Sequence, residues 1–408
     1  MYFNLYNGVD LIKGENNYLI INVFNKEIYS IDKKFYSILK KCEKGQKIEE
    51  LTNDTDFLLE KMKFLETNKI GYIFDSFDKK DSVEFSKKAL GMVWLNVTSR
   101  CNYKCIHCYE NAGRCNVKET LSLNDYDNMI NKLTSEFKIN CFQITGGEPL
   151  LRGKEFIENL LKIISKHDVG FIEIYTNLSL LDNDYLEMFK KYNVHVATSL
   201  YSQNEKVHDE ITGINGSYKL LMHNLAHLKK MNIPFRIGII IMKQNEKEKD
   251  TLRDWANKKF DLKERKQYDI VRPVGRARIV NLDNQKLFQE KYYIKNNNFS
   301  PYNFQTYMYN KIFNSCWGDK VCIKSNGEIY PCVMSNVKVG NYKDIIGCLT
   351  RKNSYRFLTK DKIHGCKKCE YRYLCTECRA IYTQNKKELK DKPFVCMYNT
   401  KTNEFRGE

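Results

Sequence analysis

Hydrophobic residues recur in two alternating patterns between residues 92 and 242. Short apolar runs of strand length lie at 93–98, 142–145, 171–175, 194–200 and 235–242. Longer stretches with apolar residues at helical spacing lie between them, at 123–137, 156–167, 181–192 and 218–230. Strands that alternate with helices in this way are typical of a parallel sheet with crossover helices. We therefore expect an α/β fold in this part of the chain.

The first 80 residues show a different order of elements. The pattern predicts strands, two or three helices and a closing strand, at 18–24, 27–31, 33–42, 48–51, 57–68 and 70–74. This order suggests a small winged-helix module. A DNA-binding wing and a purely structural cap are open alternatives for its role. Residues 75–90, which include Asp78-Lys-Lys-Asp81, are expected to form a polar linker.

Three cysteines stand within eight residues directly after the apolar run at 93–98, at Cys101, Cys105 and Cys108. Thiolates are the ligands that iron–sulfur clusters select, and a cubane cluster normally takes four of them. Three thiolates would leave one iron open to an outside ligand. Structural zinc is the competing interpretation, but it favours four closed ligands in paired short motifs, which this spacing fits poorly. His107, between two of these cysteines, is expected to point into solvent or protein rather than to bind metal.

A second motif, Gly146-Gly147-Glu148-Pro149, follows the apolar run at 142–145. Behind the cysteine triplet, it resembles the GGEP motif of the radical S-adenosylmethionine (SAM) superfamily. The resemblance implies a partial (β/α)₆ barrel in which the open iron chelates SAM and the Gly146-Gly147-Glu148 segment meets the SAM amino group. Two glycines let the backbone approach a ligand closely, and a carboxylate pairs with an ammonium group.

The same resemblance suggests further SAM-binding residues at strand ends, where chemistry gathers in such barrels. Tyr109 matches an aromatic position near the adenine. Asn177 and Ser199 are candidates for the ribose and methionyl part of SAM, although ordinary strand-end caps are equally expected there. The segment Thr176-Asn177-Leu178 stands where the family often has Thr-Asn-Gly. Arg272-Pro-Val-Gly-Arg276-Ala-Arg278 resembles a segment whose basic side chains face substrate or SAM, and an ordinary surface arginine pair is as plausible.

The C-terminal quarter carries a separate cysteine pattern. It includes Cys366-x2-Cys369-x5-Cys375-x2-Cys378, and Gly327 lies five residues before Cys332. This pattern resembles the SPASM domain, which binds two auxiliary four-iron four-sulfur clusters. The resemblance assigns the first auxiliary cluster to Cys316, Cys322, Cys332 and Cys378, and the second to Cys366, Cys369, Cys375 and Cys396. The family commonly has three residues between the last two ligands of the quoted motif, whereas this chain has two. Two zinc ribbons are the alternative.

Length and composition indicate the number of domains, the cellular compartment and the surface charge. The 408 residues suggest two or three domains, which we place at 1–80, 88–300 and 301–408. The 15 cysteines, with no visible signal peptide and no apolar run of membrane-spanning length, predict a reducing cytoplasm rather than disulfides or a membrane. The net charge of +17 comes from 67 basic and 50 acidic residues. Because the basic residues are spread along the chain, as at Lys386-Lys387, a solvated surface is favoured over nucleic-acid binding.

Together these resemblances imply an enzyme that uses SAM and three [4Fe-4S] clusters on a peptide. The N-terminal module resembles the peptide-recognition element of enzymes that modify ribosomally made peptides, where a leader adds as a strand to a sheet edge. The resemblance implies a maturase that takes a hydrogen atom from a precursor peptide and forms a cysteine thioether, as sactipeptide-type enzymes do. A flavodoxin- or ferredoxin-type protein would supply the electron. The alternatives are a sulfatase-type maturase that makes formylglycine, a carbon–carbon crosslinking or epimerising enzyme, and a binding scaffold with degenerate clusters. No catalytic base is identified.

Overall fold

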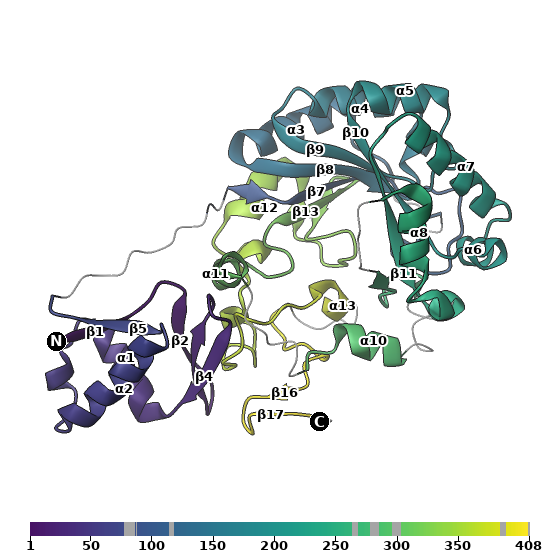
Figure 1. Ribbon diagram of the computed structural model, residues 1–408. Helices are drawn as coiled ribbons and strands as arrows, with labels where there is room; N and C mark the ends of the chain where they lie inside the picture. Colours follow the sequence, from purple (N-terminus) through teal and green to yellow (C-terminus); the bar gives the residue numbers. More distant parts are fainter. Residues whose placement is uncertain are drawn as a thin grey trace.

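The computed structural model describes residues 1–76, 86, 88–113, 118–262, 268–277, 285–295, 303–383 and 389–406. Its largest sheet is built around six parallel strands in the order β12-β11-β10-β9-β8-β7 (Figure 1). These strands are β7 (Met92–Thr98), β8 (Lys138–Gly146), β9 (Val169–Tyr175), β10 (Val194–Leu200), β11 (Phe235–Ile241) and β12 (Asp269–Ile270). The short strand β6 (Ala89–Leu90) also pairs with β8. The predicted α/β fold with a parallel sheet is confirmed.

Helices connect these strands and line the outer side of the curved sheet (Figure 1). They are α3 (Leu123–Glu136), α4 (Lys154–Ile164), α5 (Asn183–Lys191), α6 (Glu205–Thr212), α7 (Ser217–Lys230) and α8 (Leu252–Phe260). Each expected helix in this region is present, and side-chain caps from Ser122 and Asp182 mark the starts of α3 and α5. Helix α3 begins at a capping box, in which the Ser122 hydroxyl accepts from the Asp125 amide and the Asp125 carboxylate accepts from the Ser122 amide. The pattern of apolar residues did not predict α6 or α8.

The C-terminal segment continues the same sheet. Strand β13 (Lys320–Lys324) runs parallel to β7 and places Val321 beside Val93 and Ile323 beside Leu95. Strands β14 (Glu328–Tyr330) and β15 (Gly340–Asn341) follow in antiparallel pairing. The remaining elements are α10 (Gln285–Tyr292), α11 (Phe304–Ile312), α12 (Ile345–Thr350), α13 (Arg379–Thr383), β16 (Tyr398–Asn399) and β17 (Glu404–Phe405). The side chains of β7 and β13 share one hydrophobic core, so the barrel and the cysteine-rich segment are packed together.

The N-terminal module contains two small sheets and two helices. Strand β1 (Tyr2–Leu5) pairs with β5 (Gly71–Phe74), and β2 (Val9–Lys13), β3 (Tyr18–Asn22) and β4 (Glu27–Ile31) form an antiparallel sheet. Helix α1 (Lys33–Cys42), the 3₁₀ turn η1 (Ile48–Glu50) and α2 (Thr55–Thr67) complete it. The apolar pattern predicted α1 and β4 with the observed bounds but did not predict β1 and β2.

The β2-β3-β4 sheet packs on both of its faces. Neighbouring residues of β3 point to opposite sides. Ile20 joins the core of the module with Leu39 of α1 and Met62 of α2. Ile21 joins a second hydrophobic cluster with Leu374 of the cysteine-rich segment. The sheet is therefore a layer shared between the module and the C-terminal segment.

Polar contacts reinforce this junction, where the module lies beside the C-terminal segment (Figure 1). Lys311 Nζ lies 2.7 Å from Asp10 Oδ2, and Lys368 Nζ lies 2.7 Å from Glu15 Oε1. Arg372 Nη1 also donates to the Lys13 carbonyl at 2.9 Å. Strand β2 is thus tied to the cysteine-rich segment along its length.

Several sequence features lie outside the described residues. They are most of the expected linker with Asp78-Lys-Lys-Asp81, Cys115, Arg278 and Lys386-Lys387. Among the helices that are described, none combines the length and the apolar character needed to cross a membrane.

Candidate active site

One cavity of about 870 Å³ opens at the C-terminal ends of the parallel strands. Cys101, Cys105 and Cys108 all line it, together with Gly146 and Gly147. The two motifs, which are separated in sequence, therefore share one space.

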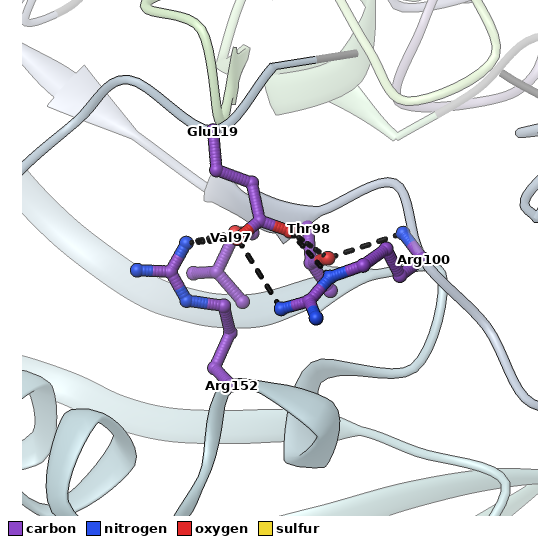
Figure 2. A network of polar contacts seen from close by, with 5 residues as sticks. All are labelled: Val97, Thr98, Arg100, Glu119 and Arg152. Atoms are coloured by element: carbon purple, nitrogen blue, oxygen red, sulfur yellow. Dashed lines mark hydrogen bonds and ion pairs between the residues drawn. The ribbon is translucent and has the colours of Figure 1, made fainter. Parts of the chain in front are cut away.

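A polar network fixes the start of the cysteine loop (Figure 2). The Glu119 carboxylate accepts from the Thr98 hydroxyl, from Arg100 Nε at 3.1 Å and from Arg152 Nη1 at 2.7 Å. Arg152 Nη1 also donates to the Val97 carbonyl at 3.3 Å. Because Arg100 directly precedes Cys101 and Arg152 follows the Gly-Gly turn, Glu119 holds both motifs in one position.

The two glycines are required by the packing of the cysteine loop itself. A Cβ atom on Gly147 would lie 2.0 Å from the Arg100 carbonyl oxygen, and one on Gly146 would lie 2.3 Å from the Thr98 carbonyl oxygen. Gly146 also has φ +143°, a conformation that favours glycine. The absence of side chains at Gly146 and Gly147 therefore allows their backbone to pack closely against the loop that carries the thiols.

Glu148 is fully buried and joins the ends of two strands. Its carboxylate accepts from Thr176 Oγ1 at 2.7 Å, from the Asn177 amide at 2.8 Å and from the Leu150 amide at 3.0 Å. Burial raises the pKa of Glu148 to about 7, although these three hydrogen bonds lower it. Glu148 is not among the described residues that line the cavity. Its contact with the SAM amino group stays a prediction.

The other predicted SAM-binding residues line the cavity. Tyr109, Asn177 and Ser199 are all in its wall. The Ser199 hydroxyl lies 2.8 Å from the Tyr175 hydroxyl, and Asn177 Nδ2 donates to Asn102 Oδ1 at 2.9 Å. The structure brings these side chains to one site, while their roles stay predictions.

Leu178 has an unusual backbone for its residue type. It is buried and has φ +64°, in the left-handed region that costs non-glycine residues free energy. Glycine is the family residue expected at this position, and the observed conformation gives the physical reason for that preference.

Arg276 closes the cysteine loop from the opposite side. Its Nε donates to the Cys105 carbonyl at 2.7 Å, and its Nη1 donates to the Ala112 carbonyl at 2.8 Å. Burial raises the pKa of the Cys101 thiol to about 11 and that of Cys105 to about 12, and the charge of Arg276 partly opposes both shifts. Of the two arginines in the Arg272–Arg278 segment that are described, Arg276 thus contacts the candidate site.

His107 contributes a buried polar atom to the cavity wall. It packs edge-on against Tyr201 at 4.7 Å between ring centroids, and burial lowers its pKa to about 4. In the described part of the chain, its Nδ1 has no hydrogen-bond partner. A buried polar atom without a partner is unfavourable, so a ligand with a polar group fits this wall. The sequence left solvent and protein open as surroundings of His107, and it did not suggest the cavity positions of Tyr175 and Tyr201.

The C-terminal cysteines form two groups. In the first, the Cys316 thiol donates to the Cys378 sulfur, which raises the pKa of Cys316 and lowers that of Cys378. The thiol of Cys332 is close enough to interact electrostatically with both Cys378 and Cys322. This group contains the four cysteines expected for the first auxiliary cluster.

The second group lines a separate cavity of about 340 Å³, and its members are Cys366, Cys369, Cys375 and Cys396. Although only two residues separate Cys375 from Cys378, Cys375 belongs to the second group and Cys378 to the first. The other described cysteines, Cys42, Cys141 and Cys348, lie elsewhere.

The described residues include no group of three or more His, Cys, Asp or Glu side chains arranged to hold a single metal ion. A cubane cluster places its four thiolates on different irons, so its ligands surround a larger volume than one ion. The shared cavities and buried thiols described above are compatible with that requirement.

Residues 95–255 match a family model, the radical SAM superfamily. The chain contains a radical SAM domain. Its fold also resembles that of Streptococcus suis SuiB, with a TM-score of 0.55 and 17% identity over 96% of this chain and 99% of SuiB. The structure of SuiB bound to its precursor peptide SuiA aligns with a TM-score of 0.51 and 17% identity over 97% and 99% of the two chains.

Two curated proteins resemble this chain in sequence. One is the cysteine-type anaerobic sulfatase-maturating enzyme of Clostridium novyi, with 24% identity over 331 residues that cover 71% of this chain and 87% of that enzyme. The other is the antilisterial bacteriocin subtilosin biosynthesis protein AlbA of Bacillus subtilis, with 29% identity over 189 residues, 45% of this chain and 40% of AlbA.

Proposed function

We propose that this radical SAM protein is a maturase that modifies a ribosomally made precursor peptide and forms a thioether between a peptide cysteine and an acceptor carbon. The observation that carries the proposal is the single cavity lined by Cys101, Cys105, Cys108 and the Gly146-Gly147 turn. The similarity to the subtilosin biosynthesis protein AlbA supports a peptide substrate.

The cofactors we propose are SAM and three [4Fe-4S] clusters. Cys101, Cys105 and Cys108 would hold the SAM-binding cluster, and the two groups of C-terminal cysteines would hold one auxiliary cluster each. When bound, SAM and its cluster supply a radical that removes a hydrogen atom from an unactivated C–H bond.

The protein's own residues position these groups. Glu119 and Arg276 fix the cysteine loop through hydrogen bonds on its two sides. Tyr109, Asn177 and Ser199 line the same cavity and would orient SAM. Tyr175 and Tyr201 add apolar surface around the reacting centre, which excludes water from a reactive intermediate.

We further propose the domain boundaries 1–80, 88–300 and 301–408 and a leader-binding role for the N-terminal module. Strand β4 pairs with β3 on one side, and among the described residues no strand pairs with its other side. Glu27 and Ser30 of β4 are exposed. An exposed edge can accept a peptide as an additional strand, held by main-chain hydrogen bonds.

The direct test is turnover of a short cysteine-rich peptide encoded beside the gene, with reconstituted protein, SAM and reductant. Thioether formation removes one hydrogen from the thiol and one from the acceptor carbon, so the product should be lighter by two hydrogen atoms and contain a crosslink. Cys348→Ala is the matched control, because Cys348 lies outside the three cysteine groups. A peptide that keeps its mass and shows no crosslink would exclude the thioether reaction.

The leader-binding role needs a test that keeps the module in place, because its sheet packs on the cysteine-rich segment. Proline is placed in turn at Tyr29 and Ser30 of β4. Neighbouring N–H groups of a strand point to opposite sides, so one variant disrupts pairing with β3 and the other removes a donor at the free edge. The variant that keeps its fold should lose leader binding. Unchanged leader affinity in that variant would argue against strand addition.

A sulfatase-type maturase is the second candidate, favoured by the alignment over 87% of the Clostridium novyi enzyme. It would oxidise a Cys or Ser of its substrate to formylglycine, whose aldehyde is trapped by a hydrazine reagent, whereas a thioether is not. Product analysis also separates carbon–carbon crosslinking and epimerisation from both. The non-enzymatic alternative, a binding scaffold, predicts no iron, whereas three cubanes predict about 12 irons per chain.

For the electron donor we propose a flavodoxin- or ferredoxin-type protein. The net charge of +17 supports attraction of an acidic partner. Reduction of the protein by such a donor should slow as salt concentration rises.

A further inference from the structure

The cavity lined by Cys366, Cys369, Cys375 and Cys396 also contains three basic side chains in its wall. These are Lys360, Arg372 and Lys392. Arg372 and Lys392 have other partners, since Arg372 Nε lies 2.9 Å from Asp361 Oδ1 and Lys392 Nζ donates to the Tyr398 carbonyl at 2.6 Å. Lys360 differs from both because it is buried and, among the described residues, its ammonium group contacts one side chain, that of Glu377.

Lys360 belongs to a buried ionic triad. Its Nζ lies 2.5 Å from Glu377 Oε1, with 4% and 1% of the two side chains exposed. Arg379 Nη1 lies 3.4 Å from the same oxygen, and Arg379 is equally buried. Apart from this contact, Lys360 Nζ has no hydrogen-bond partner among the described residues. One carboxylate therefore faces two cations, and Lys360 keeps N–H groups that are free to donate.

Burial of charge is unfavourable unless an opposite charge or a ligand compensates it. A second buried carboxylate, Glu370, accepts from the Tyr398 hydroxyl, and the exposed Asp361 pairs with Arg372. Counting Lys360, Arg372, Lys392 and Arg379 against Glu370, Glu377 and Asp361 leaves one positive charge in excess. A closed four-thiolate cluster is an anion and becomes more negative when it is reduced. The excess positive charge would therefore stabilise such a cluster, and it would stabilise the more negative, reduced form most.

We propose that Lys360, positioned by Glu377, raises the reduction potential of the auxiliary cluster held by Cys366, Cys369, Cys375 and Cys396, and so makes it an electron acceptor. This inference rests on the proposed function, in which those four cysteines bind a cluster. Nearby charge and hydrogen bonds to cluster sulfurs are among the factors that set such potentials. A cation that is shielded from water acts more strongly than a surface lysine.

The test is a redox titration of the reconstituted holoenzyme, followed by electron paramagnetic resonance, with variants of opposite expected sign. Lys360→Met removes the cation and should lower the potential of this cluster by at least about 59 mV, a tenfold change in a one-electron equilibrium. Glu377→Gln removes the neutralising carboxylate and should raise it. Lys360→Arg keeps the charge and should retain most of the wild-type value.

Lys362→Met is the matched control. Lys362 lies two residues from Lys360, is exposed, and donates to the Phe357 carbonyl away from the cysteine cavity. Its substitution should leave the potential unchanged.

The outcomes distinguish the cluster assignment from the role of Lys360. A wild-type protein without this cluster would overturn the proposed cluster assignment and this inference with it. A cluster that is present but has the same potential in Lys360→Met and Glu377→Gln would overturn only the role of Lys360. If Lys360→Met fails to retain iron, the test rests on Glu377→Gln. A cluster potential in Glu377→Gln that equals or lies below the wild-type value would then contradict the proposal.

Discussion

The junction between the N-terminal sheet and the cysteine-rich segment yields a prediction that depends on two adjacent residues. Ile20 and Ile21 are both fully buried, but Ile20 packs inside the N-terminal module and Ile21 packs against the cluster that includes Leu374 and Cys369. Ile21→Ala should therefore loosen the junction, whereas Ile20→Ala should loosen the interior of the module.

The magnitude follows from the carbon atoms removed. Isoleucine to alanine deletes three carbons, worth about 0.8 kcal/mol each, so about 2.4 kcal/mol is lost before any cavity term. Measured substitutions of this kind cost about 2–5 kcal/mol. Because about 1.4 kcal/mol is a tenfold change in an equilibrium constant, the junction should open roughly 50-fold more often.

Hydrogen exchange of peptides from wild type and the two variants measures this opening. In Ile21→Ala, exchange should accelerate in β2, β3 and residues 369–378. In Ile20→Ala, it should accelerate first in α1 and α2. Equal protection of residues 369–378 in wild type and Ile21→Ala, or equal loss in both variants, would refute the packing argument.

Three further predictions concern the candidate active site. Gly147→Ala places a Cβ atom 2.0 Å from the Arg100 carbonyl oxygen, so the cysteine loop must shift; 5′-deoxyadenosine formation should be lost, and full activity would contradict this. Glu119→Gln weakens the pairing with Arg100 and Arg152 and should lower the free energy of unfolding by about 1–3 kcal/mol. The variant should show a lower thermal midpoint and lose iron faster to a chelator. An unchanged midpoint and an unchanged rate would count against the network in Figure 2. His208 is buried, its Nδ1 accepts from the Tyr201 amide at 3.3 Å, and burial lowers its pKa to about 4. Its contribution is therefore present above its unfolded pKa of about 6.5 and is lost as the pH falls toward 4. The thermal midpoint of His208→Asn should fall less over that range than that of wild type, and identical pH profiles would argue against it.

The sequence predicted the elements that depend on local pattern. The alternation of strands and helices between residues 92 and 242 gave the parallel sheet, and the bounds of β4, α1 and β10 agree with those expected from the apolar pattern. Strands β1 and β2 were not predicted, and their pairing partners are β5 and β3. Such pairing is decided by contacts between segments rather than by local pattern.

The site was predictable as a set of residues but not as an arrangement. Short motifs and the resemblance they carry made Cys101, Gly147 and Asn177 candidates, and all three line the cavity. They did not indicate that Glu148 would bind the next strand end, or that Arg276, more than 160 residues beyond the cysteine loop, would donate to it. Those contacts form between strand ends and loops that are distant in sequence, and the periodicity of apolar residues does not predict which of these segments lie together.

The most direct test of the radical SAM assignment replaces Cys101, Cys105 and Cys108 together by alanine. The three thiols that line the candidate cavity are then absent, while both C-terminal cysteine groups remain. Iron content and 5′-deoxyadenosine are measured side by side in the reconstituted wild type and variant. The account predicts a fall from about 12 to about 8 irons per chain and no 5′-deoxyadenosine. A variant that retains the full iron content and still cleaves SAM would contradict the central assignment.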